Sequence, residues 1–318
     1  MCIRDSICSD KTGTLTQNRM TLVKAYDAAS GSLTDVSGQD SPEIKRLLEY
    51  GSLCCDGSVI EKDGEVQHIG DPTETCIVYA AMKNGSPKEK LAQEYPRLTE
   101  LPFDSDRKLM TVVCRIDGKN VVITKGAFDS MLPICTSGDM DKAQELVNSM
   151  SSDALRVLAI GCKEIDEVPE NPTIQELENG LTFMGLVGMI DPPRPEVRDA
   201  VAVCRKAGIK PVKMCIRDRD HVDTAFAIGK QLGIVSRPEQ CLTGDAVAHL
   251  DEERFLQKLD TVRVFARVSP EHKVRIVKGF KAKGNIVAMT GDGVNDAPVS
   301  YTHLDVYKRQ QRCVCGRK

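Results

Sequence analysis

The sequence predicts an α/β fold: a doubly wound parallel sheet interrupted by an inserted antiparallel α+β domain. After Asp191, short apolar runs alternate with amphipathic segments that end at glycine, which is typical of parallel sheets with crossover helices. Between residues 108 and 125, two β-branched runs flank an Asp-Gly pair, which predicts an antiparallel hairpin. We therefore expect residues 1–24 and 187–298 to form the parallel-sheet domain around an insertion at 25–186.

The first segment is predicted to be a short strand followed by a loop. Ile7, Cys8 and Ser9 lead into Asp10, and the next residues are small or carry hydroxyl groups. Such a loop lets backbone N–H groups close around an anionic ligand. Further on, residues 27–41 are polar and are expected to form a surface loop.

The insertion contains two helices with clear start signals. Ser41 and Asp71 are N-cap residues, and each precedes a proline at the first helical position. The apolar runs at 155–160 and 181–190 follow in this region of antiparallel strands, and the second is expected to be a buried strand. The second run is well short of the roughly 20 apolar residues that a membrane-spanning helix needs.

The second segment of the parallel-sheet domain is predicted to alternate strands and helices. Each helix is followed by a glycine; we expect helices at 196–207, 223–232 and 271–283, and strands at 211–214, 262–266 and 286–289. Loops at the carboxyl ends of parallel strands line one crevice. We therefore expect the crevice to bring together Asp10, Asp220, Lys273 and Asp292.

The composition argues against several classes of function. The 43 basic and 46 acidic residues are well mixed, with a net charge of −3 and no long basic run, so nucleic acid is not an expected partner. Aromatic residues make up 4% of the chain and tryptophan is absent, which argues against base-stacking surfaces. The 13 cysteines form no Cys-x-x-Cys pair, so we expect reduced thiols rather than a zinc site.

Asp10 is a candidate covalent nucleophile for phosphoryl transfer. A carboxylate needs no base to remove a proton before it attacks phosphorus, and Lys11 with a magnesium ion supplies the countercharge. Haloacid-dehalogenase-type phosphatases carry a second aspartate two residues after the nucleophile, where this chain has Thr12. Without that second carboxylate to speed hydrolysis, we expect a long-lived aspartyl-phosphate.

Three segments resemble the P-type ion pumps. Asp-Lys-Thr-Gly-Thr-Leu-Thr at 10–16 resembles their phosphorylation loop, and Thr-Gly-Asp-Gly-Val-Asn-Asp-Ala-Pro at 290–298 resembles a second pump segment over its whole length. Residues 265–273 resemble a third, whose lysine pairs with the transferred phosphate. The resemblance implies a haloacid-dehalogenase-like phosphorylation domain with the catalytic residues Asp10, Lys11, Thr12, Asp220 and Lys273. It further implies Mg²⁺ held by Asp10, the Thr12 carbonyl and Asp292, with phosphate and metal ordered by Thr290, Gly291, Asn295 and Asp296.

The same resemblance implies that the insertion is a nucleotide-binding domain. Phe103 resembles the adenine-stacking phenylalanine of the pumps, and Lys125-Gly126 resembles the start of their Lys-Gly-Ala loop. Arg156 is the expected contact to the phosphates of ATP. The other positions that the resemblance assigns to nucleotide binding are Glu74, Leu158, Asp191 and Arg267. Asp191 also matches a hinge motif.

On this resemblance, the chain is expected to be the cytosolic catalytic part of a membrane ATPase. Gly-Asp-Pro-Thr-Glu at 70–74 and Asp-Pro-Pro-Arg at 191–194 are most similar in wording to the calcium-transporting type II pumps. ATP and Mg²⁺ are the implied cofactors, and the transported cation, calcium, would bind transmembrane segments outside this chain. Two rivals stay open: a soluble haloacid-dehalogenase-type phosphatase with an unusual cap, and a nucleotide-binding module without catalysis.

The pump pattern breaks at two places. Met-Cys-Ile-Arg-Asp occurs at 1–5 and again at 214–218, where the pumps carry a Thr-Gly-Asp loop of which only Asp220 remains. Loss of one phosphate donor costs roughly a hundredfold in rate, which favours the non-catalytic rival. Residues 299–318 match nothing in the pumps. We interpret the repeated pentapeptide and this tail as foreign sequence, with natural duplication as the alternative.

Overall fold

The computed structural model describes most of the chain, namely residues 6–10, 15–17, 19–62, 64–216, 222–291 and 306–308. It describes the backbone alone for residues 10, 215, 216, 289–291 and 306–308. The chain divides into two compact units. We call Met1–Asn18 together with Asp191–Lys318 the split unit, and Arg19–Ile190 the inserted unit.

The unit boundaries differ by a few residues from the predicted ones at 24 and 187. Strand β2 (Thr21–Asp27) pairs antiparallel with β11 (Leu181–Ile190), from Thr21 opposite Ile190 to Asp27 opposite Gly185. Because these strands belong to one sheet, both lie wholly within the inserted unit. The functional names that the sequence suggests for the two units stay predictions.

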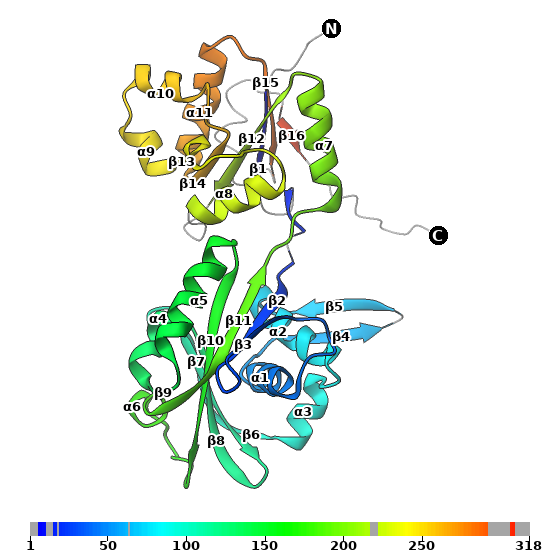
Figure 1. The fold of residues 1–318 in the computed structure, drawn as a ribbon, viewed down its shortest axis with the longest axis vertical. Helices are drawn as coiled ribbons and strands as arrows, with labels where there is room; N and C mark the ends of the chain where they lie inside the picture. Colours follow the sequence, from blue (N-terminus) through cyan, green and yellow to red (C-terminus); the bar gives the residue numbers. More distant parts are fainter. Residues whose placement is uncertain are drawn as a thin grey trace. The chain divides into compact units, whose positions relative to one another are not determined.

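The split unit is built on a parallel sheet (Figure 1). In the part that the structure describes, the strands run in the order β13-β14-β12-β1-β15-β16, and every neighbouring pair is parallel. Their bounds are β1 Ser6–Asp10, β12 Lys210–Ile216, β13 Cys241–Thr243, β14 Val264–Val268, β15 Val287–Gly291 and β16 Val306–Lys308. This sheet confirms the predicted parallel architecture and places β1 between β12 and β15.

Helices cover both faces of this sheet. Their bounds are α7 Pro195–Lys206, α8 Val222–Gln231, α9 Gly244–His249, α10 Glu252–Lys258 and α11 Pro270–Ala282, and a 3₁₀ turn lies at Pro238–Gln240. Helices α9 to α11 bury their apolar side chains in one cluster with Val212 and Met214 of β12. Lys213 points to the opposite face, where its Nζ donates to the Ala225 carbonyl of α8 at 3.1 Å. The helices predicted at 196–207, 223–232 and 271–283 are confirmed within one or two residues.

The inserted unit contains a larger, mostly antiparallel sheet. Among the described residues its strands run β3-β2-β11-β10-β8-β7-β6, and β9 pairs with β11. The additional bounds are β3 Ser32–Asp35, β6 Arg97–Asp104, β7 Leu109–Ile116, β8 Lys119–Gly126, β9 Cys135–Ser137 and β10 Arg156–Ile165. A separate pair of strands is formed by β4 (Ser58–Lys62) and β5 (Glu65–Ile69). The antiparallel α+β insertion is thus present.

One hairpin was predicted and one strand was not. β7 and β8 pair antiparallel around Asp117 and Gly118, whose φ values of 50° and 80° are both positive, as a two-residue hairpin turn requires. By contrast, β3 lies inside the stretch 27–41 that was predicted to be a loop, and this prediction was wrong. β3 is a short edge strand with mostly exposed side chains, so it leaves no apolar alternation in the sequence.

Helices pack on the large sheet, and the predicted capping residues start two of them. Ser41 Oγ accepts from Ile44 N–H at 3.4 Å before α1 (Pro42–Leu53), and Asp71 Oδ1 accepts from Thr73 N–H at 2.7 Å before α2 (Pro72–Lys83). The other bounds are α3 Lys88–Glu94, α4 Phe128–Met131, α5 Met140–Ser152 and α6 Ile174–Leu177, with a 3₁₀ turn at Leu132–Ile134. Across all the residues described, the structure has no helix that is both long enough and apolar enough to cross a bilayer.

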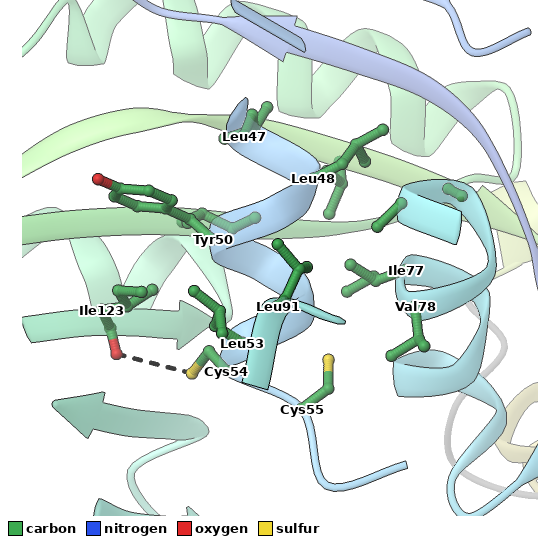
Figure 2. Close-up of a cluster of buried hydrophobic side chains, with 14 of the residues drawn as sticks. Leu47, Leu48, Tyr50, Leu53, Cys54, Cys55, Ile77, Val78, Leu91 and Ile123 are labelled. Atoms are coloured by element: carbon green, nitrogen blue, oxygen red, sulfur yellow. Dashed lines mark hydrogen bonds between the residues drawn. The ribbon is translucent and has the colours of Figure 1, made fainter. Parts of the chain in front are cut away.

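The core of the inserted unit lies between α1, α2, α3 and the sheet. Figure 2 shows leucines of α1 beside Ile77 and Val78 of α2 and Leu91 of α3, all of them buried. The Cys54 thiol at the end of α1 contacts the Ile123 carbonyl of β8 at 3.6 Å. Each fully buried aliphatic side chain stabilises the fold by about 1.5 to 3 kcal/mol, so this core holds α1 and α2 firmly against the strands.

Candidate active site

The carboxyl edge of the parallel sheet brings three strand ends together. Asp10 is the last residue of β1, and its Cα pairs with that of Met214 on β12. On the other side of β1, Ser9 pairs with Thr290 of β15. Because parallel strands end at the same edge, the loops after β1, β12 and β15 begin side by side. The backbone therefore places Asp10 at the centre of this edge.

Several predicted site residues lie outside the described residues. Their contacts therefore stay predictions, as do the side-chain contacts of Asp10 and Thr290 and the role of Gly291. In chain order, Asp220 belongs to the connection between β12 and α8, and Asp292 directly follows β15. The predicted site residues that lie outside the described part of the structure are Lys11, Thr12, Asp220, Asp292, Asn295 and Asp296.

Lys273 is a fully buried lysine on the first turn of α11. A capping box fixes the start of this helix: Ser269 Oγ accepts from His272 N–H at 3.3 Å, and His272 Nδ1 accepts from Ser269 N–H at 3.2 Å. Burial raises the pKa of the Cys8 thiol to about 12, and the positive charge of Lys273 acts against this rise. The Lys273 charge therefore lies near Cys8 of β1, which stands two residues before Asp10 in the chain.

The carboxyl end of β14 carries a strained backbone position. Arg267 has a φ of 53°, in the left-handed region that residues other than glycine seldom adopt. A Cβ atom at Gly244 would lie 2.1 Å from the Arg267 carbonyl oxygen, so only glycine fits there. Arg267 itself is exposed and belongs to the split unit. Its predicted part in nucleotide binding stays a prediction.

The end of the predicted phosphate loop is bound to the segment that begins at Asp191. Thr16 is buried, and its hydroxyl donates to Asp191 Oδ2 at 2.6 Å. The backbones also pair, because Gln17 N–H donates to the Pro192 carbonyl at 3.0 Å and Arg194 N–H donates to that of Leu15, also at 3.0 Å. Asp191 thus holds the last threonine of the loop motif in place. Its predicted nucleotide contact and hinge role stay predictions.

In the inserted unit, Glu74 and Lys125 form a buried ion pair. Lys125 Nζ lies 2.9 Å from Glu74 Oε1 and 3.2 Å from the Cys55 sulfur. Glu74 Oε2 accepts from the backbone N–H groups of Asp56 and Gly57 at 2.8 and 2.9 Å. The pair therefore joins α2, β8 and the loop after α1, and it confines two opposite charges at one end of β8.

Both members of this pair are ionised at neutral pH. Burial acts to lower the pKa of Lys125, but the nearby Cys55, Cys54 and Glu74 raise it above the usual value. Burial likewise acts to raise the pKa of Glu74, and the Lys125 charge with the Gly57 hydrogen bond brings it below the usual carboxyl value. The positive charge of Lys125 is thus balanced by Glu74, and the predicted contact of Lys125 with a nucleotide stays a prediction.

Gly126 is required by a close backbone approach. A Cβ at this position would lie 2.2 Å from the Lys108 carbonyl oxygen and 2.6 Å from Leu109 Cδ2. Lys108, with a φ of 58°, leads out of the turn that follows Phe103. The predicted nucleotide residues Lys125 and Gly126 are thus next to the turn that follows Phe103, which lies near the end of β6.

Gly126→Ala is expected to destabilise the chain by about 2 kcal/mol or more, because the added methyl group must displace the Lys108 backbone. Urea unfolding measures the loss. Gly118→Ala is the matched control at the other end of β8: its Cβ would meet nothing within 4 Å, so it costs only the left-handed backbone conformation, about 1 kcal/mol. Equal losses in the two variants would contradict the steric explanation.

The remaining nucleotide residues of the inserted unit lie on nearby strands. Phe103 precedes Asp104 on β6, and Asp104 pairs with Leu109 on β7. Leu109 pairs in turn with Gly126 on β8. The backbones of Phe103 and Gly126 are therefore separated by two strand spacings, about 10 Å. The Phe103 side chain is 61% exposed, as a stacking platform must be. On β10, Arg156 Nη1 donates to Thr73 Oγ1, beside Glu74, at 2.8 Å. Leu158 shares the face of Arg156 and packs against the core.

Two arginines that support the predicted nucleotide residues were not predicted from the sequence. Arg107 forms an ion pair with Glu178, which is only 4% exposed, and donates to the Pro102 carbonyl at 2.7 Å, so it binds the residue before Phe103 to the turn that follows it. Arg97 donates to the Leu53 and Cys55 carbonyls at 2.7 and 2.9 Å and thereby holds the loop that Glu74 also binds. Partners this far apart in sequence carry no local signal.

Comparison with known proteins identifies the family. Calcium-transporting ATPase 1 of Bacillus cereus is 43% identical over 305 residues, covering 92% of this chain and 33% of the relative. The model of P-type ATPase cytoplasmic domain N matches residues 43–196, and that of haloacid dehalogenase-like hydrolases matches residues 134–299. The chain belongs to the haloacid dehalogenase-like hydrolases, whose model matches more than half of it. Together with the match to domain N, this confirms the predicted resemblance to P-type ATPases and the predicted fold class.

Two further relatives give the same result. Calcium-transporting ATPase of Bacillus subtilis is 39% identical over 321 residues, with 92% of this chain and 36% of the relative covered. Calcium-transporting ATPase 1 of Lactococcus lactis is 39% identical over 306 residues, with 92% of this chain and 34% of the relative covered. The chain thus spans about a third of the length of these relatives.

P-type ATPases as a class use Mg²⁺ and ATP. Carboxylate and carbonyl oxygens are the ligands that Mg²⁺ prefers, and Asp10, Thr12 and Asp292 are the residues that the sequence predicts to supply them. Within the described residues, no group of three or more His, Cys, Asp and Glu side chains is placed to hold a metal ion. The predicted ligands therefore depend on residues outside the description and on the Asp10 side chain.

Proposed function

We propose that this chain is the catalytic portion of an ATP-driven cation pump that works through an aspartyl-phosphate. The observation that carries the proposal is the position of Asp10 at the end of β1, between β12 and β15. A phosphate bound at this edge would lie beside the end of β1, where the backbone places Asp10, and beside the ends of both neighbouring strands. The proposed longer protein is a membrane protein, and this portion is proposed to lie in the cytosol.

The proposed reaction is an in-line transfer of the γ-phosphoryl group. The inserted unit holds ATP, with adenine against Phe103 and the phosphates near Lys125 and Arg156. An oxygen of the Asp10 carboxylate forms a bond to the γ-phosphorus while the bond to ADP breaks. Lys273 and Lys11 neutralise the charge on the transferred group. When bound by Asp10, Thr12 and Asp292, Mg²⁺ supplies charge neutralisation of the phosphate oxygens.

Calcium is the proposed transported ion. The support is the set of relatives whose names describe calcium transport, together with the calcium-type wording of residues 70–74 and 191–194. The ion itself is proposed to bind transmembrane segments of the longer protein. Membrane vesicles that contain the longer protein are expected to accumulate radioactive calcium when ATP is added, and uptake of another cation in its place would contradict this assignment.

The reaction is tested by incubating the chain with Mg²⁺ and ATP labelled at the γ-phosphate. We expect a protein-bound label that survives acid and is released by hydroxylamine, as an acyl phosphate is. Thr12 stands where phosphatases of this fold carry a hydrolytic aspartate, so the label should persist. Rapid phosphate release from small phosphate esters, with no protein-bound label, would instead favour the soluble phosphatase.

A second candidate is nucleotide binding without catalysis. The observation that favours it is the segment 215–220, where Cys-Ile-Arg-Asp-Arg-Asp stands in place of the Thr-Gly-Asp loop of the pumps. A missing hydroxyl donor would weaken phosphate binding after β12. ATP binding that is lost in Phe103→Ala, combined with no phosphoenzyme under any condition, would establish this candidate over the first.

A further inference from the structure

A cluster of basic side chains lies at the amino ends of the parallel strands, at the sheet edge opposite Asp10. A cavity of about 230 Å³ lies where β12, β13 and β14 begin. Lys210 is the first residue of β12, Gln240 precedes β13, and Arg263 precedes β14; all three line the cavity. Lys210 pairs with Ser6, four residues before Asp10, so about 13 Å of β1 separates this cavity from the carboxyl edge.

The lining is basic on one side and apolar on the other. Arg205 joins Lys210 and Arg263 as the third cation, and Ile209 and Ile234 contribute apolar surface. No acidic residue is found among the lining residues that the structure describes. Such a lining suits an anion that carries a small apolar or organic part.

Backbone carbonyls hold both guanidinium groups in place. Arg205 Nη2 donates to the Ile234 carbonyl at 3.0 Å, which fixes the end of α7 beside the loop after α8. Arg263 donates through Nη1 to the Leu259 and Val262 carbonyls, at 2.9 and 2.6 Å, and through Nη2 to that of Asp260 at 2.8 Å. An anion would therefore meet two cations whose side-chain entropy is already lost.

The positive charge here exceeds the nearby negative charge. Asp260 is the acidic group beside Lys210 and Arg263, and its carboxylate is bound by Lys283 Nζ at 2.8 Å. The Asp260 carboxylate thus interacts with three cations, Lys283, Lys210 and Arg263, and Arg205 adds a further positive charge near Arg263. Burial lowers the pKa of Arg263, and the like charge of Arg205 lowers it further while Asp260 acts against this. An anion in the cavity would relieve this repulsion.

We propose that this cavity binds a phosphate-bearing anion through Arg205, Lys210 and Arg263. The planar arginine fork matches phosphate oxygens, which favours phosphate over a simple monovalent anion. A volume of about 230 Å³ is below the roughly 300 to 1,000 Å³ of pockets for drug-sized ligands, so it takes a phosphate with a small organic part rather than a whole nucleotide. The source is either a soluble phosphate ester or the headgroup of an anionic phospholipid.

The test has two arms on the 318-residue chain. In one, glycerol phosphate is titrated while hydrogen–deuterium exchange follows the amides of residues 208–210. In the other, the chain is floated with vesicles of phosphatidylcholine, with and without phosphatidic acid. Protection by glycerol phosphate identifies a soluble ester, and binding only to vesicles with phosphatidic acid identifies a lipid headgroup. Either result supports the site.

Two variants and a matched control locate the binding. Arg205→Gln and Lys210→Gln are each expected to weaken binding roughly tenfold or more, because each removes a charge-assisted contact. Arg198→Gln is the control, since Arg198 is also exposed on α7 but lies seven residues away, about 10 Å along the helix. Arg263 is left unchanged because it also holds the end of α10.

Three results would overturn the proposal. The first is that neither glycerol phosphate nor vesicles with phosphatidic acid bind. The second is that Arg198→Gln weakens binding as much as Arg205→Gln does, which would indicate diffuse surface charge. The third is protection confined to the backbone next to Asp10, which would place the phosphate at the carboxyl edge. None of these results depends on ATP hydrolysis, so the proposed function and this site are tested separately.

Discussion

Asp10→Asn is expected to abolish the phosphoenzyme and to lower ATP turnover by at least about 10⁴-fold. An amide oxygen is a far weaker nucleophile than a carboxylate, and no other route to a covalent intermediate is left. The substitution changes almost no volume at the end of β1, so the parallel sheet should keep its stability. Acid-quenched labelling with ATP measures the phosphoenzyme, and thermal unfolding checks the fold.

A charge-matched control shows whether the loss is specific to Asp10. Asp199 is exposed on α7, within the same unit, and Asp199→Asn is expected to be labelled as fully as the unmodified chain. If Asp10→Asn keeps its hydroxylamine-sensitive label, another carboxylate is the nucleophile and the assignment of Asp10 is wrong. If both variants lose the label, the effect is one of overall charge.

Lys125→Met is expected to destabilise the inserted unit by about 3 kcal/mol and to weaken ATP binding. The substitution leaves the mostly buried Glu74 carboxylate without the ammonium group 2.9 Å away, and an uncompensated buried charge is costly. Urea unfolding measures the stability and titration with ATP measures the affinity. The double variant Lys125→Met with Glu74→Gln should recover part of the stability, because it removes the stranded charge as well.

Lys119 provides the matched control on the same strand. It pairs with Glu164 at 2.8 Å, but both side chains are more than 60% exposed, so Lys119→Met should leave the unfolding midpoint almost unchanged. Additive losses in the Lys125 and Glu74 double variant would mean that the two residues are not coupled.

The pH dependence of the Glu74 and Lys125 pair follows from its two pKa shifts. Because the pKa of Glu74 is lowered on folding, its contribution to stability is present above the usual carboxyl pKa and is lost as the pH falls through the lowered value. Because the pKa of Lys125 is raised, its contribution is present at neutral pH and is lost only in strong alkali. Lys125→Met should therefore weaken the acid sensitivity that this pair produces.

Local chemistry explains what the sequence predicted well. Ser41 and Asp71 cap helices because their side chains bind the first free N–H groups, and Gly208 ends a helix because it adopts a positive φ. Asp117-Gly118 predicts a hairpin for the same reason. The shared edge of the strand ends follows from the parallel architecture. The position of β1 between β12 and β15 comes from the structure and was not predicted.

Features that depend on distant partners could not be predicted in this way. The ion pair between Arg107 and Glu178 joins residues 71 positions apart, and Glu178 lies in a polar stretch that looks like surface. The edge strand β3 gains its structure from pairing with β2 rather than from its own side chains. The basic cavity at Arg205 and Arg263 likewise arises only when the starts of separate strands meet.

The most direct test of the central claim is to identify the phosphorylated residue by mass spectrometry. After incubation with Mg²⁺ and ATP, borohydride reduces an acyl phosphate at aspartate to homoserine, which marks the modified position permanently in the digested peptides. The position of Asp10 at the end of β1, between β12 and β15, predicts homoserine at residue 10. Homoserine at residue 220, 292 or 296 instead, or at no residue, would contradict the account.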